Sequence, residues 1–328
     1  MFDTLVQFGV NWIVAIQSLG GWLEIPMKFF TFLGSENFFY LVLPLVYWCI
    51  EAALGLRVGF ILLASASLNS MAKLWFAGPR PYWVSDKVIP FSAESSFGVP
   101  SGHAQNAVSV WGILAASIRK PWAWISAGLL MFFIGFSRWY LGVHFIHDGV
   151  LGWLLGILLG WVFVRFEKPV VAWFKSMTFL QQVSAAFAAS LVVIALGWIS
   201  ALPLAGYTFP AEWADNALRA GPLPAPVSTD GFFSSAGTLF GFLLGVAWLA
   251  PRGGYQASGP VGKRAIRYVI GLIGVLLFWK GLDFVFPAGE DFIGFFFRYL
   301  RYFLVGLWIS AGAPYLFFHF KLADRPKM

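Results

Sequence analysis

Long apolar runs separated by short polar breaks dominate the chain from residue 38 onward. A helix needs about 20 mostly apolar residues to cross the hydrocarbon core of a bilayer. Nine runs approach that length, near residues 38–55, 58–76, 102–118, 122–138, 147–165, 179–201, 231–250, 268–286 and 294–317. The pattern therefore predicts an all-α integral membrane protein with about nine transmembrane helices.

The pattern differs in the first 34 residues and around residues 202–230. Gly20, Gly21 and Pro26 divide the apolar N-terminal part into pieces too short to span, so we expect helices that lie in the membrane interface. Residues 202–230 contain five prolines and are predicted to form an outer loop. The chain is therefore predicted to have three regions: interfacial helices over 1–34, a motif-bearing core over 35–166, and a four-helix membrane extension of unknown role over 167–328.

Composition supports a membrane protein and argues against other classes. Hydrophobic residues make up 59% of the chain and charged residues 11%, whereas soluble domains average about 45–50% and 25%. The net charge of +7 does not indicate a nucleic-acid partner, because the basic residues are scattered at the ends of apolar runs. The single Cys49 excludes a disulfide framework and a thiolate metal site, and the absence of Lys before Lys28 predicts no cleaved signal peptide.

The distribution of Lys and Arg predicts the orientation in the membrane, since short cytoplasmic loops are enriched in both. With nine alternating spans, 13 of the 22 basic residues fall on the side of the turn that contains Arg119 and Lys120. That side is predicted to be cytoplasmic, and Arg325 and Lys327 are counted on it. Loops 77–101 and 138–147 then face away from the cytoplasm, in a multi-pass protein of the cytoplasmic (inner) cell membrane.

Three polar stretches interrupt the apolar pattern at the predicted outer ends of the spans. They run from Lys73 to Pro81, from Pro100 to His103 and from Ser137 to Asp148. Charged side chains are costly in lipid, so their presence there needs a reason. Basic residues at span edges often serve only as anchors, but all three stretches lie on the side that basic residues avoid. This placement favours a shared binding site.

The first two stretches carry groups suited to a phosphate. Lys73 offers a mobile positive charge, and Arg80 offers a planar fork that matches phosphate oxygens. Ser101 is a favoured N-cap for the helix that begins near residue 102, and a helix start binds anions through its free N–H groups. Gly102 lets a ligand approach the backbone closely, and His103 adds a side chain that titrates near neutral pH.

The third stretch adds another cation and a paired histidine. Arg138 supplies a second guanidinium, and His144 and Asp148 stand four residues apart, which puts both on one face of a helix. A carboxylate bound to one imidazole nitrogen leaves the other nitrogen a better nucleophile. Phosphoryl transfer requires cations, a nucleophile and an acid for the leaving group.

These stretches resemble the three signature motifs of the type 2 phosphatidic acid phosphatase (PAP2) superfamily, which also contains vanadium haloperoxidases. Eleven positions agree and none departs from the pattern. They read Lys73-x6-Arg80-Pro81, Pro100-Ser101-Gly102-His103 and Ser137-Arg138-x5-His144-x3-Asp148. The resemblance covers roughly residues 35–166 and implies a PAP2-type helical bundle as the core of the fold.

The resemblance also implies a role for each motif residue. His144 would be the nucleophile that forms a phosphohistidine, Asp148 its partner, and His103 the acid that protonates the leaving group. The phosphoryl oxygens would be held by Lys73, Arg80, Ser101, Gly102 and Arg138. The resemblance implies catalysis without a metal or other cofactor, so no metal-ligand residue is predicted.

Other polar residues receive no catalytic role. His147 lies in the third stretch without a motif position, and we expect it to be dispensable. His319 is expected at the membrane interface. Ser65 and Asn69, inside a predicted span, favour helix packing over chemistry.

The sequence thus predicts a metal-independent phosphatase that hydrolyses a lipid phosphate or lipid pyrophosphate at the extracytoplasmic face. Its predicted partners are that substrate and the bilayer, without nucleic acid, and the oligomeric state is not predicted. A lipid phosphotransferase with the same intermediate stays open. A haloperoxidase is disfavoured by the nine spans, and a lipid-phosphate transporter or scramblase by the His144–Asp148 pair.

The lipid itself is not predicted, because the motifs recognise only a phosphate. Undecaprenyl pyrophosphate, phosphatidylglycerol phosphate, phosphatidic acid and sphingoid phosphates all carry a phosphate on an apolar tail.

Overall fold

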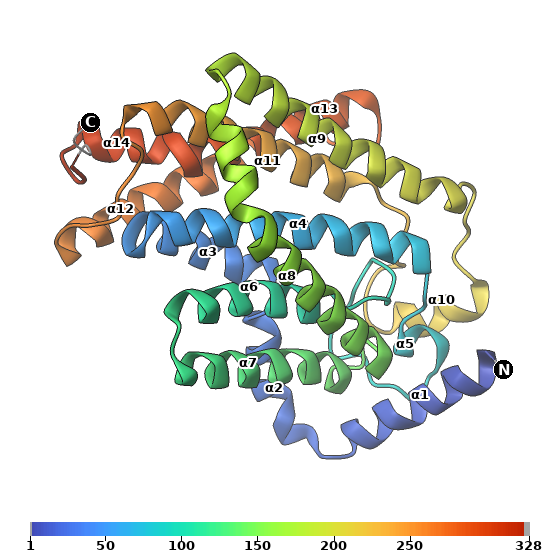
Figure 1. Cartoon of the computed structure of the whole chain (residues 1–328). Helices are drawn as coiled ribbons and strands as arrows, with labels where there is room; N and C mark the ends of the chain where they lie inside the picture. Colours follow the sequence, from blue (N-terminus) through green and yellow to red (C-terminus); the bar gives the residue numbers. More distant parts are fainter. Residues whose placement is uncertain (1, 325–328) are drawn as a thin grey trace. The chain divides into compact units, whose positions relative to one another are not determined.

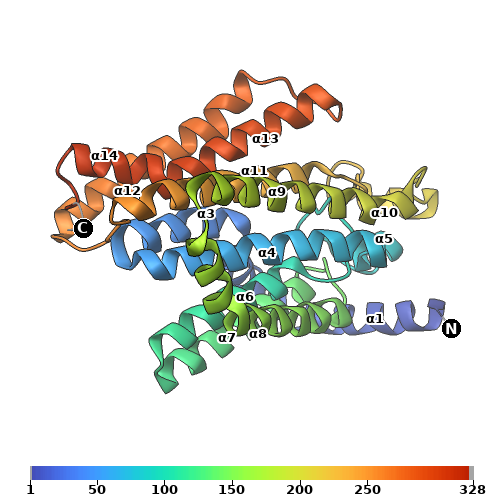
Figure 2. The same ribbon diagram turned by 45° about the horizontal axis from the view of Figure 1, so that its top comes forward.

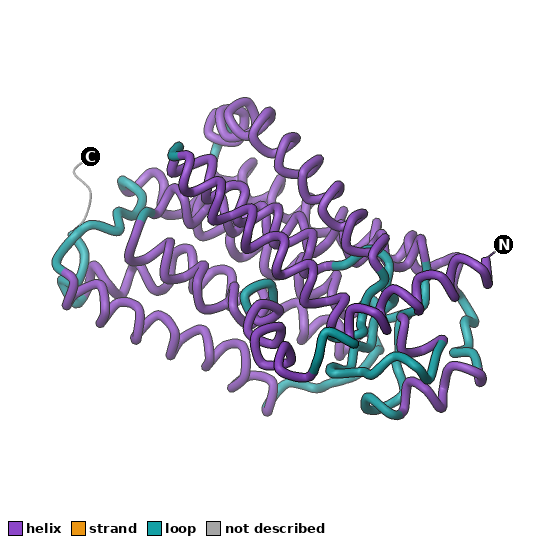
Figure 3. Tube along the Cα trace, turned by 90° about the horizontal axis from the view of Figure 1, so that it is seen from below, coloured by secondary structure: helices purple, strands orange, loops and turns teal. Residues whose placement is uncertain are grey.

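A computed structural model describes residues 2–324, and over that range it contains helices and loops but no strand (Figure 3). The chain packs into two compact units. The first unit takes the described residues of Met1–Phe39, Ala64–Val162 and Trp198–Ser228, and the second takes those of Tyr40–Leu63, Phe163–Gly197 and Thr229–Met328. Arg325 and Lys327, which contribute to the predicted orientation, lie outside the described residues.

Six helical segments of the described chain are long and apolar enough to cross a membrane. They cover Ala52–Val84, Ile146–Ser176, Phe179–Leu204, Asp230–Arg252, Val261–Phe284 and Phe292–His319. A seventh is counted if Gly21–Phe32 and Glu36–Ile50, which meet at a bend of 49°, form one broken span. The chain is therefore a multi-pass membrane protein by length and composition of its helices, but the predicted count of nine spans is not confirmed.

Three of the nine predicted runs are not among the six segments. One is residues 38–55, most of which belong to the bent pair, and the other two are helices of the first unit, α6 (Gly102–Ile118) and α7 (Pro121–Tyr140). Helix α6 has 17 residues, about 26 Å at 1.5 Å per residue, which is shorter than a hydrocarbon core of about 30 Å. Helix α7 has 20 residues but carries Ser137 and Arg138 in its last turn. The two helices pack side by side as a hairpin (Figure 1).

The N-terminal part forms two short helices, α1 (Phe2–Gln17) and α2 (Glu24–Phe32), joined by a 3-10 turn over Gly21–Leu23. This confirms the predicted break at Gly20 and Gly21, whereas the location of the helices in the membrane interface stays a prediction. Both pack on the first unit: the Gln17 amide donates to the Tyr140 carbonyl at 3.0 Å, and Phe30 of α2 stacks on Phe133 of α7.

A polar layer joins α4 (Ala52–Phe76) to α6. The Ser65 hydroxyl donates to the Asn106 side-chain oxygen at 2.7 Å, and the Asn69 amide donates to the Gln105 side-chain oxygen at 2.9 Å. These contacts show Ser65 and Asn69 in helix packing, and Asn69 in addition lines the cavity described below. On the other side of α6, helix α8 (Ile146–Ser176) approaches closely, because a Cβ at Gly152 would lie 2.6 Å from the Ser101 carbonyl oxygen.

Residues 202–228 belong to the first unit and contain a 3-10 turn (Leu202–Leu204) and helix α10 (Ala211–Leu218). Helix α10 packs on α5 (Pro81–Val84). The Arg219 guanidinium donates to the carbonyls of three residues in the loop after α5, namely Asp86 at 2.8 Å and Ser85 and Val88 at 3.3 Å each. The predicted outer loop is therefore tied to the loop that connects the first two motifs.

Arg219→Ala is expected to loosen this attachment, because it removes three hydrogen bonds to backbone carbonyls. The amides of α10 should exchange with deuterium about tenfold faster or more, as expected for the loss of one to two net hydrogen bonds. Lys87→Ala, an exposed position of the same loop, is the control and should leave exchange unchanged. Equal protection of α10 in both variants would contradict the proposed attachment.

The second unit is built from the membrane helices of the C-terminal part and the start of α4. Its helices include α3 from Tyr40 onward (Glu36–Leu45 in full), a π-helical turn over Val46–Ile50, α9 (Phe179–Ala201), α11 (Asp230–Leu249), α12 (Val261–Leu276), α13 (Phe292–Leu307) and α14 (Ala313–His319). The last three are the orange to red helices of Figure 2. Its core forms around the fully buried Trp48, whose indole donates to the Ile309 carbonyl at 3.0 Å.

Candidate active site

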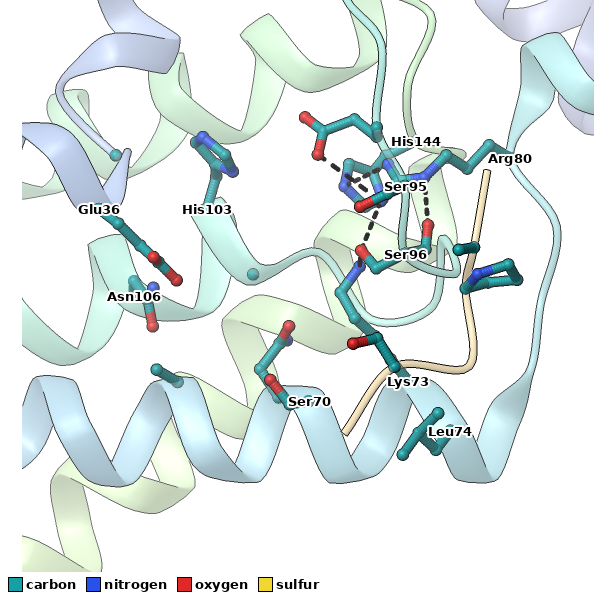
Figure 4. A pocket seen from close by; sticks show the side chains of 18 residues that line it. Glu36, Ser70, Lys73, Leu74, Arg80, Ser95, Ser96, His103, Asn106 and His144 are labelled. Atoms are coloured by element: carbon teal, nitrogen blue, oxygen red, sulfur yellow. Dashed lines mark hydrogen bonds and ion pairs between the residues drawn. The ribbon is translucent and has the colours of Figure 1, made fainter. Parts of the chain in front are cut away.

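A cavity of about 310 Å³ lies in the first unit, between α4, the loop after α5 and the start of α6 (Figure 4). Five of the eight predicted site residues line it: Lys73, Arg80, Gly102, His103 and His144. The other three, Ser101, Arg138 and Asp148, are buried and contact residues of the same site. The fold thus brings together three motifs that are separated by up to 75 positions in the sequence.

His144 lies in the turn before α8, between a carboxylate and a guanidinium. Its Nδ1 is 3.2 Å from Asp148 Oδ2, and its Nε2 is 3.3 Å from Arg80 Nη1. An ionised carboxylate only accepts hydrogen bonds and a guanidinium only donates them. These contacts therefore assign the ring proton to Nδ1 and leave a lone pair on Nε2, the atom nearer the cations.

The charge state of His144 follows from its surroundings. The side chain is almost completely buried. Burial lowers the pKa of His144 to about 3, the positive charge of Arg80 acts in the same direction, and Asp148 opposes both. The imidazole is therefore neutral near pH 7, which keeps the Nε2 lone pair available.

Asp148 holds the turn around His144 in place. Its Oδ2 accepts the Phe145 backbone N–H at 2.9 Å in addition to the contact with His144, and its carbonyl oxygen accepts the Ser101 N–H at 2.9 Å. The other carboxylate oxygen is 3.1 Å from Nε2 of His147, whose ring stacks on Phe145. His147 thus contacts Asp148, although the side chain is about two-thirds exposed, at 66%.

Lys73 and Arg80 are held by one short segment of the loop before α6. The Lys73 ammonium donates to the Ser96 hydroxyl at 3.1 Å and to the Phe97 carbonyl. Arg80 donates through Nε to the Ser96 carbonyl at 2.7 Å and through Nη1 to the Val143 carbonyl at 2.8 Å. These bonds position both cations at one end of the cavity, beside His144 (Figure 4).

The sequence analysis missed Glu94, which lines the cavity and forms an ion pair with Arg138. Arg138, in the last turn of α7, also donates to the Thr31 hydroxyl of α2 and does not itself line the cavity. Burial alone would raise the pKa of Glu94, but the guanidinium groups of Arg138 and Arg80 lower that pKa well below its usual value. In the sequence, Glu94 stands out only as an acidic residue between the stretch with Lys73 and Arg80 and the later stretch with Arg138.

The start of α6 has the features of an anion site. The Ser101 hydroxyl accepts the Ala104 N–H at 3.4 Å as the N-cap of the helix. The N–H groups of the first helical turn have no acceptor within the helix, so those of Gly102 and His103 are directed toward a ligand at this end. A Cβ at Gly102 would lie 2.9 Å from the Asn69 side-chain oxygen, so a larger residue here would displace the Asn69 amide.

A second polar group was not predicted as part of the site. Glu36, at the start of α3, and Asn106, one turn beyond His103, line the same cavity together with Asn69 and Ser70. Figure 4 shows Glu36, Asn106 and His103 at the end of the cavity away from Lys73 and Arg80. The sequence gives Glu36 only as a polar residue in the break before an apolar run.

No group of three or more His, Cys, Asp or Glu side chains in the described part of the chain is arranged to hold a metal ion. The residues that converge on the cavity are instead two cations, two imidazoles, two carboxylates and several amides and hydroxyls. Such a set can bind an anion and supply a neutral imidazole nitrogen to it.

Comparisons with known proteins bear on this arrangement. The family model described as "PAP2 superfamily" matches residues 54–172, and the model "PAP2 superfamily phosphatase, transmembrane extension" matches residues 233–325. Phosphatidylglycerophosphatase B of Bacillus subtilis is 32% identical over 166 residues, which cover 45% of this chain and 77% of that protein.

A second relative and a solved structure also match this chain. Glucose-6-phosphatase 3 of Rattus norvegicus is 28% identical over 185 residues, so the match spans 53% of that protein and 49% of this chain. Among solved structures, a transmembrane PAP2-type phosphatidylglycerolphosphate phosphatase from Bacillus subtilis superposes with a TM-score of 0.44 at 30% identity, over 51% of this chain and 88% of that chain.

Proposed function

This chain belongs to the PAP2 superfamily of membrane phosphatases, and from that membership we propose that it hydrolyses a lipid phosphate or lipid pyrophosphate through a phosphohistidine intermediate. The observation that carries the proposal is the position of His144 between Asp148 and Arg80. In this position the neutral imidazole directs the lone pair of its Nε2 toward the end of the cavity that contains Lys73 and Arg80. The cavity is large enough for a phosphate head group.

In the first step, Nε2 of His144 attacks phosphorus and an N–P bond forms. The bond between phosphorus and the leaving-group oxygen breaks, its electron pair goes to that oxygen, and protonated His103 gives the oxygen a proton. Burial and the positive charge of Arg138 lower the pKa of His103, so the negative charge of the bound phosphate has to stabilise its imidazolium. Lys73, Arg80 and the start of α6 at Ser101 and Gly102 stabilise the phosphoryl oxygens, and Arg138 adds positive charge behind them.

In the second step, water attacks phosphorus and the N–P bond breaks, with its electron pair returning to Nε2 of His144. His103 takes a proton from the attacking water and thereby returns to its starting state. Asp148 accepts the hydrogen bond from Nδ1–H of His144 throughout and balances the positive charge that the ring acquires in the intermediate. The products are the dephosphorylated lipid and inorganic phosphate.

The membrane setting supports a lipid substrate, and the extracytoplasmic face is proposed from the distribution of Lys and Arg alone. The site is formed by ends of apolar helices, so an apolar tail can stay in the bilayer while the head group enters the cavity. If α6 and α7 do not cross the membrane, the turn with Arg119 and Lys120 lies on the same side as the site. The two helices form a hairpin, so all later helices keep their direction, and the other 11 of the 13 basic residues stay on the proposed cytoplasmic side.

The test is phosphate release by the purified protein from a panel of lipid phosphates in mixed micelles, with and without EDTA. We expect release of inorganic phosphate from at least one lipid at the same rate in both conditions, because the described site offers side-chain cations in the place of a metal. Loss of activity in EDTA that a divalent metal restores would contradict metal-independent catalysis. A phosphorylated acceptor without free phosphate would instead identify a phosphotransferase.

A further inference from the structure

The catalytic cavity reaches the protein surface at both of its ends. Of the residues that line it, three are exposed, namely Glu36, Ser95 and Ala225. Figure 4 shows Glu36 at the end with His103, and Ser95 beside His144 at the opposite end. The cavity therefore has one opening near the proposed acid and a second opening near the proposed nucleophile.

Ala225 belongs to a proline-rich segment that borders the second opening. We call this segment, residues 222–228, the strap, and three of its residues line the cavity. The strap begins beside the loop that holds both cations, because a Cβ at Gly221 would lie 3.1 Å from the Cβ of Ala93. In Figure 4 the strap is the pale orange segment next to the two cations. It thus lies at the phosphate end of the cavity.

The strap is stiff and is anchored next to its start. Three of its seven residues are prolines, whose rings fix the backbone angle φ, and two of these, Pro224 and Pro226, are buried. Just before the strap, Arg219 donates to three backbone carbonyls of the loop after α5. The strap therefore forms a fixed rim on one side of the second opening.

The two products of the proposed reaction are formed at different ends of the cavity. His103 protonates the lipid leaving group near the first opening, whereas the phosphoryl group stays on Nε2 of His144 until water releases it. Inorganic phosphate then lies closer to the second opening. Glu94 is the carboxylate at that end, 3.9 Å from the Arg80 guanidinium, and its charge is balanced by Arg138, so it does not block the path of an anion.

We propose that inorganic phosphate leaves through the opening between Ser95 and the strap, while the lipid reaches and leaves the cavity at the end with Glu36. The proposal rests on the proposed function, because it requires a phosphoryl group that stays on His144 after the lipid departs. The strap lies between the ranges that the two family models match, 54–172 and 233–325. One side of this exit is therefore formed by the segment that connects the catalytic part of the chain to its C-terminal helices.

The test attaches a bulky maleimide to a cysteine at the exit and follows both products, with the lipid that gives the highest rate. In Ala225→Cys, labelling should slow steady-state phosphate release by at least about tenfold, because a product that cannot leave limits kcat. The first turnover should be unaffected and give about one dephosphorylated lipid per active site, at the rate of the unlabelled variant. Each variant is compared with its own unlabelled form, so the effect of the substitution itself cancels.

Leu223→Cys is the matched control, because Leu223 lies on the same strap and is 50% exposed but does not line the cavity. Its labelling should leave both rates unchanged, as should treatment of the unmodified protein, whose Cys49 is buried. The exit would be overturned by an unchanged steady-state rate in labelled Ala225→Cys or by an equal loss in labelled Leu223→Cys. A first turnover slowed as much as the steady state would also overturn it, since the lipid itself would then pass the strap. Release of phosphate from no lipid by the unmodified protein would instead overturn the proposed function.

Discussion

His144→Ala is expected to reduce phosphate release by at least about ten-thousandfold, the scale seen when a covalent nucleophile is removed. The expectation follows from the geometry, since no other described side chain combines an unprotonated imidazole nitrogen with contacts to both Asp148 and Arg80. The measurement is the initial rate of phosphate release by purified protein with the lipid that gives the highest rate.

His319→Ala is the matched control, because this histidine is exposed and belongs to the second unit. It should retain the full rate. Acid-labile, alkali-stable labelling of the unmodified protein by a radioactive substrate, absent in His144→Ala, would identify the intermediate. Full activity of His144→Ala would rule out the proposed mechanism, and lipid translocation that survives in the inactive variant would favour a transporter.

Replacement of Asp148 is expected to have the second-largest effect, with a clear difference between alanine and asparagine. Asp148 Oδ2 faces two N–H donors, those of His144 and Phe145. An asparagine can keep its oxygen there and turn its amide nitrogen toward His147, so the His144 tautomer survives and only the negative charge is lost. Alanine loses both the charge and the orientation of the ring.

Asp148→Ala should therefore lower kcat by about ten-thousandfold, and Asp148→Asn by about a hundredfold. The measurement is kcat at saturating lipid for both variants under the same micelle conditions. Equal losses would show that the charge of Asp148 matters and the orientation of His144 does not. The comparison also tests His147, whose ring nitrogen must accept a hydrogen bond from the new amide in Asp148→Asn.

The helical, multi-pass nature of the chain was predictable because hydrophobic run length is a local property. The six long apolar helices coincide with predicted runs, for example Phe179–Leu204 with residues 179–201. Whether helices α6 and α7 are membrane spans was harder to predict. Their runs are apolar, but α6 turns a polar side with Gln105 and Asn106 toward α4, and sequence periodicity does not reveal which neighbour covers such a side.

In the candidate site, the motif residues were predictable from the sequence, whereas the residues that contact them were not. The motif spacing predicted Lys73, Arg80, His103 and His144, and all four line one cavity. Glu94 and Ser96 were missed, because they lie in an irregular loop and act through contacts with cations far away in the sequence.

The sequence by itself determined the membrane helices, the membership of residues 54–172 in a phosphatase family and the identity of the motif residues. These properties depend on local composition and on short fixed spacings, which the chain carries without folding. Tertiary structure alone decided that residues 202–228 join the first unit, that Arg138 pairs with Glu94, and that Glu36 shares a cavity with His103. Such contacts join residues far apart in the chain, and only the packing of whole helices brings them together.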